Sequence, residues 1–381
     1  MMQKLLIFLS VFFYGLSILL PYHGVPWVTF ESELFAFISL LSLVGLCVYQ
    51  NNKIPKLNLF IVCIAFIPLV QFLCGQVIYL SNAVLTSGYI LVLFFSIFVG
   101  FNLSQNQKWK NVVFKFITYS FFVIGLISAS FVILQWLGLS HYLSLYIVNV
   151  SGYRPYANMA QPNNLAIFMI ISLFSALYLK EKKNIPSGVV ISSVILILLA
   201  IALTQSRTAW IVFIFILIYL SLKRNVKDIG VIRKDIYLFS SIFFIFVSYL
   251  PSIGVFFKEI LHFNILAISS AGERVSSGHL RLDLWQQAYY AIIDQPWFGF
   301  GWNQSSVAQI TIFNLYPNHE WIRSFHNIVF DVLVWNGLPI GIAILVYAIY
   351  LLYRLEKNCL SLESILAMMM IFAVVIHSVF E

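Results

Sequence analysis

The chain has 381 residues, of which 61% are hydrophobic and only 9% are charged, whereas about a quarter of an ordinary soluble domain is charged. Together with a mean hydropathy of +0.93, this excludes a soluble enzyme and indicates a chain that lies mostly in lipid. The net charge of +8 does not predict a nucleic-acid partner, because basic residues in a membrane protein first report sidedness.

The long apolar runs predict helices rather than the strands of a β-barrel, because 121–139 and 189–203 are apolar on every face and show no alternation. We therefore expect an all-α fold: a polytopic integral membrane protein with about eleven transmembrane helices and one large outer loop that carries short amphipathic helices. The expected spans lie near residues 5–21, 34–49, 57–74, 83–101, 112–138, 163–179, 187–203, 209–222, 236–253, 327–353 and 363–380.

The basic residues predict which side of these spans faces the cytoplasm. With the N-terminus cytoplasmic, the inner loops hold all but six of the 22 Lys and Arg, as the positive-inside rule requires. The outer six are Arg154, Arg207, Lys258, Arg274, Arg281 and Arg323. All seven histidines also fall outside, namely His23, His141, His262, His279, His319, His326 and His377. We therefore look for function on the outer face.

The spans divide the chain into three parts. Residues 1–253 hold the first nine helices with short loops, 254–326 form the large outer loop, and 327–381 hold the last two helices. The chain ends at Glu381 directly after an apolar segment, which leaves truncation open as one interpretation. The four cysteines show no metal-ligand or disulfide spacing, so we predict no metal and no cofactor.

A polar stretch leads into the sixth predicted span. The sequence "SGYRPYANMAQPNNLAIF" contains Arg154, Gln161, Asn163 and Asn164. Pro162 is typical of a first helical turn and asparagine of a helix cap, but tyrosines, amides and an arginine at one membrane rim are also typical of a sugar site. Both interpretations stay open.

Arg207 lies in a short polar turn, "LTQSRTAW", between two very apolar spans. An arginine at the outer mouth of a hairpin opposes the charge rule and is costly near hydrocarbon. It either anchors the turn at the lipid headgroups or binds an anion, with donors added by Gln205, Ser206 and Thr208.

The outer loop contains a predicted amphipathic helix. Its apolar residues recur at helical spacing and are Leu284, Trp285, Ala288, Tyr289 and Ile292. Ser277 and Gly278 precede it and Pro296 stops it. Arg281 in its first turn, beside free amides, suits a phosphate, although contact with lipid headgroups is an equal alternative. The "GFGW" that follows predicts a turn.

His326 stands where the tenth predicted span leaves the interface, followed by Asn327 and, one turn deeper, Asp331. Histidine is the natural proton acceptor near neutral pH, which makes His326 a candidate general base. A structural hydrogen bond is the alternative. Arginines beside a membrane and one histidine together fit a polyprenyl-diphosphate sugar donor, whose leaving diphosphate needs positive charge.

At these motifs the sequence resembles the O-antigen ligase and polymerase-like superfamily of bacterial inner-membrane glycosyltransferases. The matching segments are "SRTAW", "RLDLW" with "PWFGFGW", and "FHN" with "NGLPIG". Within the superfamily, "RPYANMAQPNNLA", "HNIVFDVLVWNGLP", "HSVFE" and "PWVTFESELFAF" are most similar to protein O-oligosaccharyltransferases that glycosylate pilins and other periplasmic proteins.

The resemblance implies transfer of an oligosaccharide from undecaprenyl diphosphate to Ser or Thr of a periplasmic acceptor such as pilin, on the periplasmic face of the inner membrane. It assigns His326 to the acceptor hydroxyl and Arg207, Arg281 and Arg154 to the diphosphate. Residues near the glycan or acceptor would be Gln161, Asn163, Asn327, Glu33, His377 and Glu381. Family members continue beyond the last motif, so the resemblance puts the activity of this shorter chain in question.

Two alternatives remain at this point. A lipopolysaccharide O-antigen ligase or O-antigen polymerase would use the same donor with a different acceptor. A lipid-linked sugar transporter would be expected to carry ionisable groups deep in its spans along a pathway. Asp331 lies near one end of its span, which disfavours transport.

Overall fold

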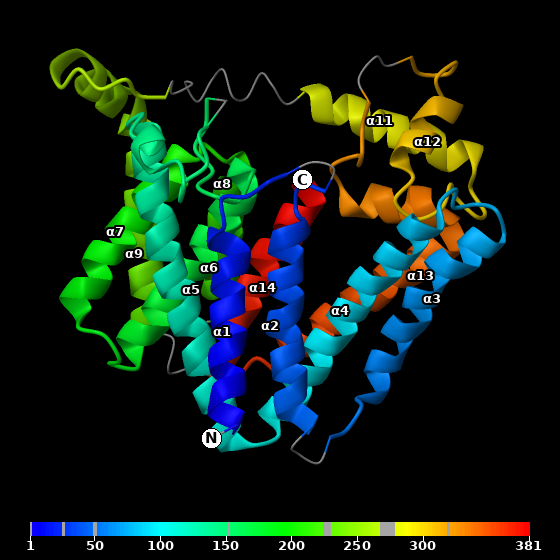
Figure 1. The fold of residues 1–381 in the computed structure, drawn as a ribbon, viewed down its shortest axis with the longest axis horizontal. Coiled ribbons are helices and arrows are strands. Elements are labelled where there is room, and N and C mark those ends of the chain that lie inside the picture. Colours follow the sequence, from blue (N-terminus) through cyan, green and yellow to red (C-terminus); the bar gives the residue numbers. More distant parts are fainter. Residues whose placement is uncertain are drawn as a thin grey trace. The chain divides into compact units, whose positions relative to one another are not determined.

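The structure is a computed structural model, and it describes residues 2–24, 27–48, 52–150, 153–223, 230–266, 279–317 and 321–381. In these ranges every regular element is helical (Figure 1). The chain forms two compact units: unit 1 comprises Met1–Leu46, Asn106–Arg274 and Cys359–His377, and unit 2 comprises Cys47–Gln105, Val275–Asn358 and Ser378–Glu381.

Each predicted span coincides with a helix in the described chain. The helices are α1 (Met2–Leu19), α2 (Phe30–Val48), α3 (Leu59–Leu73), α4 (Leu80–Ser104), α5 (Gln107–Trp136), α6 (Pro162–Glu181), α7 (Ser187–Leu203), α8 (Arg207–Leu222), α9 (Gly230–Val255), α13 (Ile328–Lys357) and α14 (Leu362–Phe380). Among the described residues, eight helices are long and apolar enough to cross a membrane, while α3, α7 and α8 are shorter. The all-α membrane fold is confirmed; the count of eleven spans stays a prediction.

The core of unit 1 is built around α6, which packs on α5 and α7. A helix that is apolar on all sides is expected to be buried, and 78% of the apolar window of α6 is buried. Gly125 of α5 permits the closest approach, because a Cβ there would lie 1.9 Å from the hydroxyl of Ser172 on α6. Small residues at such crossings are typical of membrane helices.

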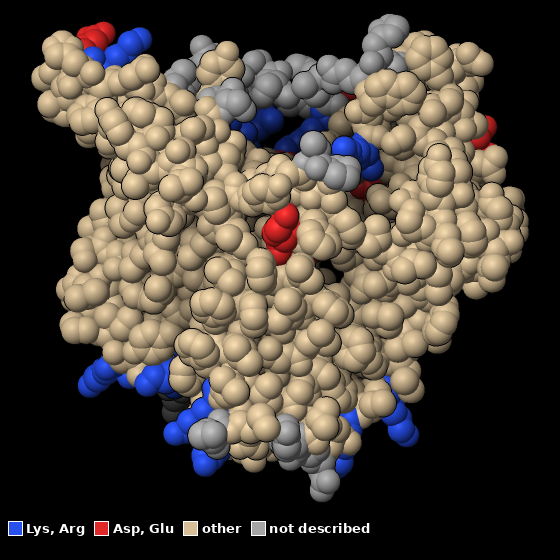
Figure 2. All heavy atoms as spheres, in the orientation of Figure 1, with Lys and Arg blue, Asp and Glu red and all other residues tan. Residues whose placement is uncertain are grey.

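Charged residues of unit 1 gather at the end where α6 finishes. Lys180 bonds to Asp235 at 2.6 Å, and Lys182 bonds to Glu363 at 2.8 Å. Figure 2 shows further blue side chains along the lower edge of the molecule. The side of the membrane on which these charges lie stays a prediction.

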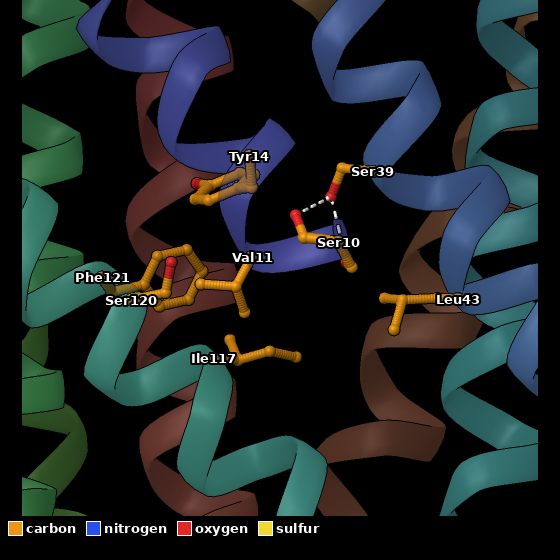
Figure 3. A pocket seen from close by; sticks show the side chains of 8 residues that line it. All are labelled: Ser10, Val11, Tyr14, Ser39, Leu43, Ile117, Ser120 and Phe121. Atoms are coloured by element: carbon orange, nitrogen blue, oxygen red, sulfur yellow. Dashed lines mark hydrogen bonds between the residues drawn. The ribbon is translucent and has the colours of Figure 1, made fainter. Parts of the chain in front are cut away.

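A small cavity of about 140 Å³ lies between α1, α2 and α5 of unit 1 (Figure 3). Its lining residues are Ser10, Val11, Tyr14, Ser39, Leu43, Ile117, Ser120 and Phe121. The hydroxyl of Ser39 donates to the backbone oxygen of Ser10 at 2.7 Å, and the two hydroxyls lie 3.1 Å apart. Paired hydroxyls of this kind join two helices inside an apolar environment.

In unit 2 the long helix α13 is broken at Gly337, where φ is 70° and ψ is 175°. Pro339 follows the break and cannot donate a helical hydrogen bond. The carbonyl oxygens of Val334 and Trp335, freed by the break, accept from the amides of Phe300 at 2.8 Å and Gly301 at 2.9 Å. The "PWFGFGW" segment is therefore a turn, as predicted, and it is bonded to the kink in α13.

Two glycines make this contact possible. A Cβ on Gly299 would lie 2.5 Å from the nitrogen of Gly337, and a Cβ on Gly337 would lie 2.5 Å from the carbonyl group of Trp297. Both residues also have positive φ, which glycine adopts at no steric cost. The "PWFGF" and "WNGLP" motifs thus form a single structural feature of unit 2.

Three glutamines bond this feature to the end of the α3–α4 hairpin. The amide of Gln71 donates to the oxygen of Trp335 at 3.1 Å, and that of Gln76 donates to the oxygen of Gly299 at 2.7 Å. Gln304 donates to the oxygen of Gln76 at 2.6 Å. Buried backbone groups in an apolar unit must be paired, and these amides supply the partners.

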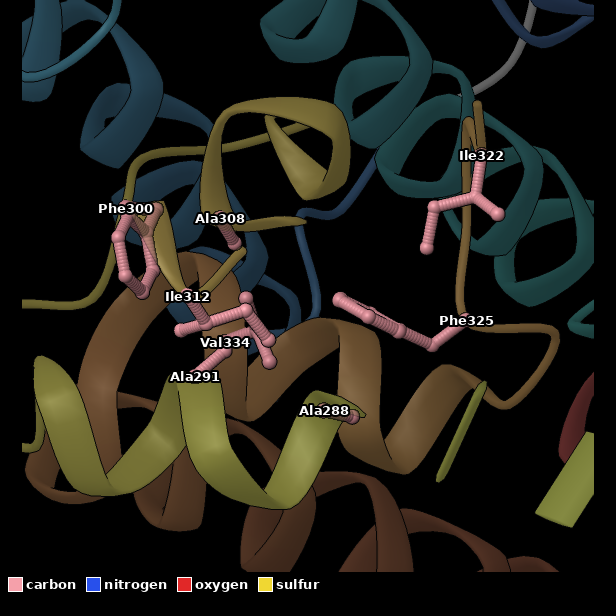
Figure 4. Packing of buried hydrophobic residues seen from close by; sticks show 8 residues of the cluster. All are labelled: Ala288, Ala291, Phe300, Ala308, Ile312, Ile322, Phe325 and Val334. Atoms are coloured by element: carbon pink, nitrogen blue, oxygen red, sulfur yellow. The ribbon is translucent and has the colours of Figure 1, made fainter. Parts of the chain in front are cut away.

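The segment between α9 and α13 folds, within its described residues, over a small apolar core (Figure 4) of Ala288, Ala291, Phe300, Ala308, Ile312, Ile322, Phe325 and Val334. The predicted amphipathic helix is α11 (His279–Asp294), which ends two residues before Pro296. Its buried face differs from the predicted one: Tyr289 is 57% exposed, whereas Gln287 and Ala291 are fully buried. A second short helix, α12 (Ser305–Thr311), completes the core. The predicted helix start at Ser277 and Gly278 lies outside the described residues.

Candidate functional site

His326 lies in the loop that leads into α13 of unit 2, and its backbone is in the left-handed region with φ of 53°. Its amide donates to the hydroxyl of Ser324 at 2.9 Å. The side chain is half-buried, so the imidazole has access to a bound molecule while its backbone is fixed.

The contact of the imidazole defines its tautomer. Nδ1 of His326 lies 3.2 Å from the backbone oxygen of Glu381. Because that oxygen can only accept, Nδ1 carries the proton in the neutral ring, and Nε2 keeps its lone pair. Within the described residues, no hydrogen bond to Nε2 is found. The geometry is that of a histidine able to accept a proton at Nε2.

Arg281 lies in the first turn of α11, as predicted, and forms an ion pair with the carboxylate of Glu381. The Glu381 side chain is 7% exposed and that of Arg281 is 26% exposed. Glu381 therefore contacts both Arg281, through its side chain, and His326, through its backbone. We call these three residues the His326 corner.

Asn327 and Asp331, which share a face at the start of α13, contribute to the structure of the same unit. The side-chain oxygen of Asn327 accepts from the amide of Val329 at 2.9 Å and caps the helix. Asp331 is only 3% exposed and accepts from Ser305 and Ser324. Asp331 lies in the first turn of α13, one turn after His326 as the sequence predicted, but the sequence did not identify the two serines as its partners.

In unit 1, Arg154 joins the start of α6 to the end of α7. Its Nε donates to the backbone oxygen of Thr204 at 2.7 Å, and its Nη2 donates to the side chain of Asn163 at 2.8 Å. We call Arg154, Asn163 and Thr204 the Arg154 cluster. Nearby in sequence, burial raises the pKa of the Tyr156 hydroxyl still further above neutral pH, so this hydroxyl is protonated and able to donate.

The interpretation of Asn163 and Asn164 as helix caps is wrong, because the cap position of α6 is occupied by Gln161 and Pro162 begins the helix. The two asparagines instead face other polar side chains. Asn163 accepts from Arg154, and the side-chain oxygen of Asn164 lies 2.8 Å from Nε2 of His377 on α14. Since an amide oxygen accepts, His377 donates through Nε2.

Arg207 is the first residue of α8, so the helix begins two residues earlier than the sequence predicted. The turn before it is deeply buried, with Thr204, Gln205 and Ser206 at 0%, 4% and 1% exposure. Gln205 has a positive φ of 53°. Like Arg281, Arg207 thus combines a guanidinium with the amides of a helix N-terminus, an arrangement that suits an anion.

The remaining predicted residues are less central. Glu33 lies in the first turn of α2, where its carboxylate accepts from the hydroxyl of Thr29 at 2.6 Å. Arg323 is exposed. Arg274 and His319 lie outside the described residues. Among those described, no group of three His, Cys, Asp or Glu side chains is arranged to hold a metal ion.

Comparison with known proteins places this chain in a family. The sequence pattern of the family described as O-Antigen ligase matches residues 192–346. The General O-oligosaccharyltransferase of Acinetobacter baylyi (strain ATCC 33305 / BD413 / ADP1) is 35% identical over 380 residues, which cover 100% of this chain and 67% of the relative. This chain belongs to the O-oligosaccharyltransferase family of O-antigen ligase-like glycosyltransferases.

A second O-oligosaccharyltransferase, described as ComP-specific and from the same organism, is 27% identical over 377 residues, covering 98% of this chain and 66% of the relative. The chain thus spans about two thirds of the length of these relatives. The resemblance inferred from the motifs is confirmed, as is the class of enzyme. The matched ligase segment contains Arg207, Arg281 and His326, whereas Arg154 precedes it and Glu381 follows it.

Proposed function

We propose that this O-oligosaccharyltransferase moves an oligosaccharide en bloc from undecaprenyl diphosphate to Ser or Thr hydroxyls of periplasmic proteins such as pilin. The protein would lie in the bacterial inner membrane with a cytoplasmic N-terminus, and would act on the periplasmic face. The names of the relatives support glycan transfer, and the charge distribution supports the orientation.

The observation that carries the mechanism is the tautomer of His326. Nε2 holds the lone pair, so it accepts the proton of the acceptor hydroxyl as the hydroxyl oxygen attacks the anomeric carbon. The bond between that carbon and the diphosphate oxygen breaks, and undecaprenyl diphosphate leaves with the electron pair. No further reactant is needed for the atoms and charges to balance.

The leaving diphosphate gains charge as the bond breaks, so fixed positive groups accelerate the step. We assign this role to Arg207 and Arg281, each at a helix N-terminus, with Arg154 as a further contact. Gln161, Asn163, Asn327, Glu33, His377 and Glu381 remain assigned to the vicinity of the glycan or the acceptor.

The test is transfer by the purified protein in lipid nanodiscs, supplied with undecaprenyl-diphosphate glycan and a Ser-rich pilin-type acceptor, with the intact mass of the acceptor as readout. We expect a glycan-sized increase that disappears in Arg207→Ala, Arg281→Ala and His326→Ala. Matched controls are His141→Ala and Arg354→Ala, which alter exposed residues and should keep normal transfer.

A specific alternative follows from the ligase segment, since an O-antigen ligase or polymerase would use the same donor. Consumption of the donor on lipid A core or on a second glycan, with no change in acceptor protein mass, would replace the proposed acceptor. Near-normal transfer by both Arg207→Ala and Arg281→Ala would contradict the diphosphate assignment.

A further inference from the structure

A buried carboxylate supports the loop that carries His326. Asp331 is 3% exposed, and its Oδ1 accepts from the hydroxyl of Ser305 at 3.0 Å and from the amide of Phe325 at 3.0 Å. Its Oδ2 accepts from the hydroxyl of Ser324 at 2.7 Å. Three donors on one carboxylate offset part of the cost of burying it.

Ser324 connects this carboxylate to His326. Its hydroxyl gives its only proton to Asp331, so the same oxygen must act as acceptor for the amide of His326 at 2.9 Å. The direction of every hydrogen bond from His326 to Asp331 is therefore determined. An ionised carboxylate can only accept, so the hydrogen bond between Ser324 and Asp331 cannot run in the opposite direction while Asp331 is ionised.

The connection matters because the backbone of His326 is strained. A non-glycine residue with φ of 53° is sterically disfavoured relative to the right-handed region, because its Cβ comes too close to a backbone carbonyl oxygen. Such a conformation persists only when the surrounding contacts determine it. The neighbours of His326 are both fixed: Phe325 is fully buried and Asn327 caps α13.

A carboxylate is not required to hold an ordinary apolar loop, since well-packed hydrophobic residues stabilise a buried site at least as well as a buried charge. Unlike apolar packing, the hydrogen bonds of the carboxylate fix the orientation of the backbone before His326. Its bonds reach the two residues immediately before His326, and they hold the loop in the one conformation that turns Nδ1 toward the Glu381 oxygen.

We propose that Asp331 and Ser324 are positioning residues for His326: they hold its backbone in the left-handed conformation that leaves Nε2 free to face the acceptor hydroxyl. This inference rests on the proposed function of His326 as the base. Neither residue contacts substrate in this role. A displacement of about 1 Å at a reacting group can lower a rate by about 100-fold, so their removal acts on turnover.

The experiment measures kcat and the donor KM of full-length variants in nanodiscs. Ser324→Ala removes the hydrogen bond to Asp331 and the hydrogen bond from the amide of His326. We expect kcat to fall at least about 10-fold, with the donor KM within about two-fold of that of the parent. Ser324→Thr keeps the hydroxyl and should restore most of the activity. Asp331→Asn should resemble Ser324→Ala.

The matched control is Ser306→Ala. Ser306 lies beside Ser305 on α12, and its hydroxyl donates to the backbone oxygen of Ile322 at 2.7 Å. This bond involves neither Ser324, Asp331 nor His326. Its removal costs a similar hydrogen bond, so a merely structural role predicts that both serine variants lose thermal stability and activity alike. Positioning predicts that only Ser324→Ala loses turnover beyond its loss of stability.

A double-mutant cycle separates this inference from the proposed function. If Ser324 acts through His326, then Ser324→Ala adds no further loss to the residual transfer rate of His326→Ala, followed at high enzyme concentration over long incubations, because effects within one catalytic unit are not additive. Equal multiplicative losses in both backgrounds, or a normal kcat in Ser324→Ala while His326→Ala is inactive, would overturn the positioning role and leave the proposed function intact. Full transfer by His326→Ala would overturn both.

Discussion

The His326 corner of unit 2 and the Arg154 cluster of unit 1 hold their polar side chains by different means. In unit 2 the acceptors are carboxylates: Asp331 holds the loop before His326, and Glu381 holds Arg281. In unit 1 a backbone oxygen and the amide of Asn163 are among the acceptors that hold Arg154. Carboxylates therefore organise the first region, whereas neutral acceptors take part in the second.

The difference bears on the roles proposed for the two regions. Charge-assisted hydrogen bonds are roughly twice as strong as neutral ones, which suits the single orientation proposed for the base. Neutral acceptors direct a guanidinium without cancelling its charge, so the contacts of Arg154 with Thr204 and Asn163 leave its attraction for an anion in place. Arg281 differs, because the carboxylate of Glu381 competes for its charge.

The largest expected effect comes from the close contact between Gly337, at the kink of α13, and the backbone of Trp297 in unit 2. Gly337→Ala places a Cβ 2.5 Å from backbone atoms of Trp297 at a φ of +70°, so the chain must move. We expect a loss of about 4 kcal/mol or more in the free energy of unfolding, measured by thermal or denaturant unfolding in detergent. Gly75→Ala is the control, because Gly75 has a φ of +75° but no atom within 4 Å of the added Cβ. A loss no larger than that of the control would contradict the contact.

A smaller effect is expected in unit 1. Arg154→Lys keeps the charge, but an ammonium cannot reproduce the two-acceptor geometry of the guanidinium. With the bond to Thr204 or the bond to Asn163 lost, the free energy of unfolding should fall by about 1–2 kcal/mol, measured as above. Arg354→Lys, at an exposed position, should change it little. An unchanged stability in Arg154→Lys would show that the cluster tolerates rearrangement entirely.

The fold and the positions of several candidate residues could be predicted from the sequence because they depend on local signals. Apolar runs predicted each of the eleven long apolar helices to within about six residues, and Arg281 and His326 lie, as predicted, at the starts of α11 and α13, whereas α12 was not predicted. These positions follow from hydropathy, Pro296 as a stop and the polar residues beside each helix. None of them requires knowledge of distant contacts.

What the sequence could not give were the pairs of residues far apart in the chain. Ser305 and Asp331 are joined across 26 positions, and Asn164 and His377 across 213. No periodicity encodes such pairs. The one available signal for the glutamine contacts was Gln71, a polar residue within a very apolar helix, whose presence there requires a buried partner.

Glu381→Gln tests the comparison by removing the negative charge from the His326 corner. The substitution keeps the backbone oxygen that faces His326 but weakens the ion pair with Arg281. If Arg281 binds the donor diphosphate, its competing partner is weakened, so the donor KM should fall about 3- to 10-fold, equivalent to roughly 0.7–1.4 kcal/mol. The value of kcat should stay close to that of the parent. A raised KM would show that Glu381 assists donor binding rather than competing with it.

The smallest effect concerns the charged end of unit 1 and tests whether charge alone gives strong coupling. Lys182 and Glu363 form an ion pair with side chains 42% and 21% exposed, whereas those of Lys180 and Asp235 are 20% and 16% exposed. Exposed pairs are screened by solvent, so double-mutant cycles should give at most about 0.5 kcal/mol for Lys182–Glu363 and a larger value for Lys180–Asp235. Equal coupling in the two pairs would mean that burial does not govern the strength of a carboxylate contact here. The stronger hold ascribed to the buried Asp331 would then have to come from its number of donors rather than from its surroundings.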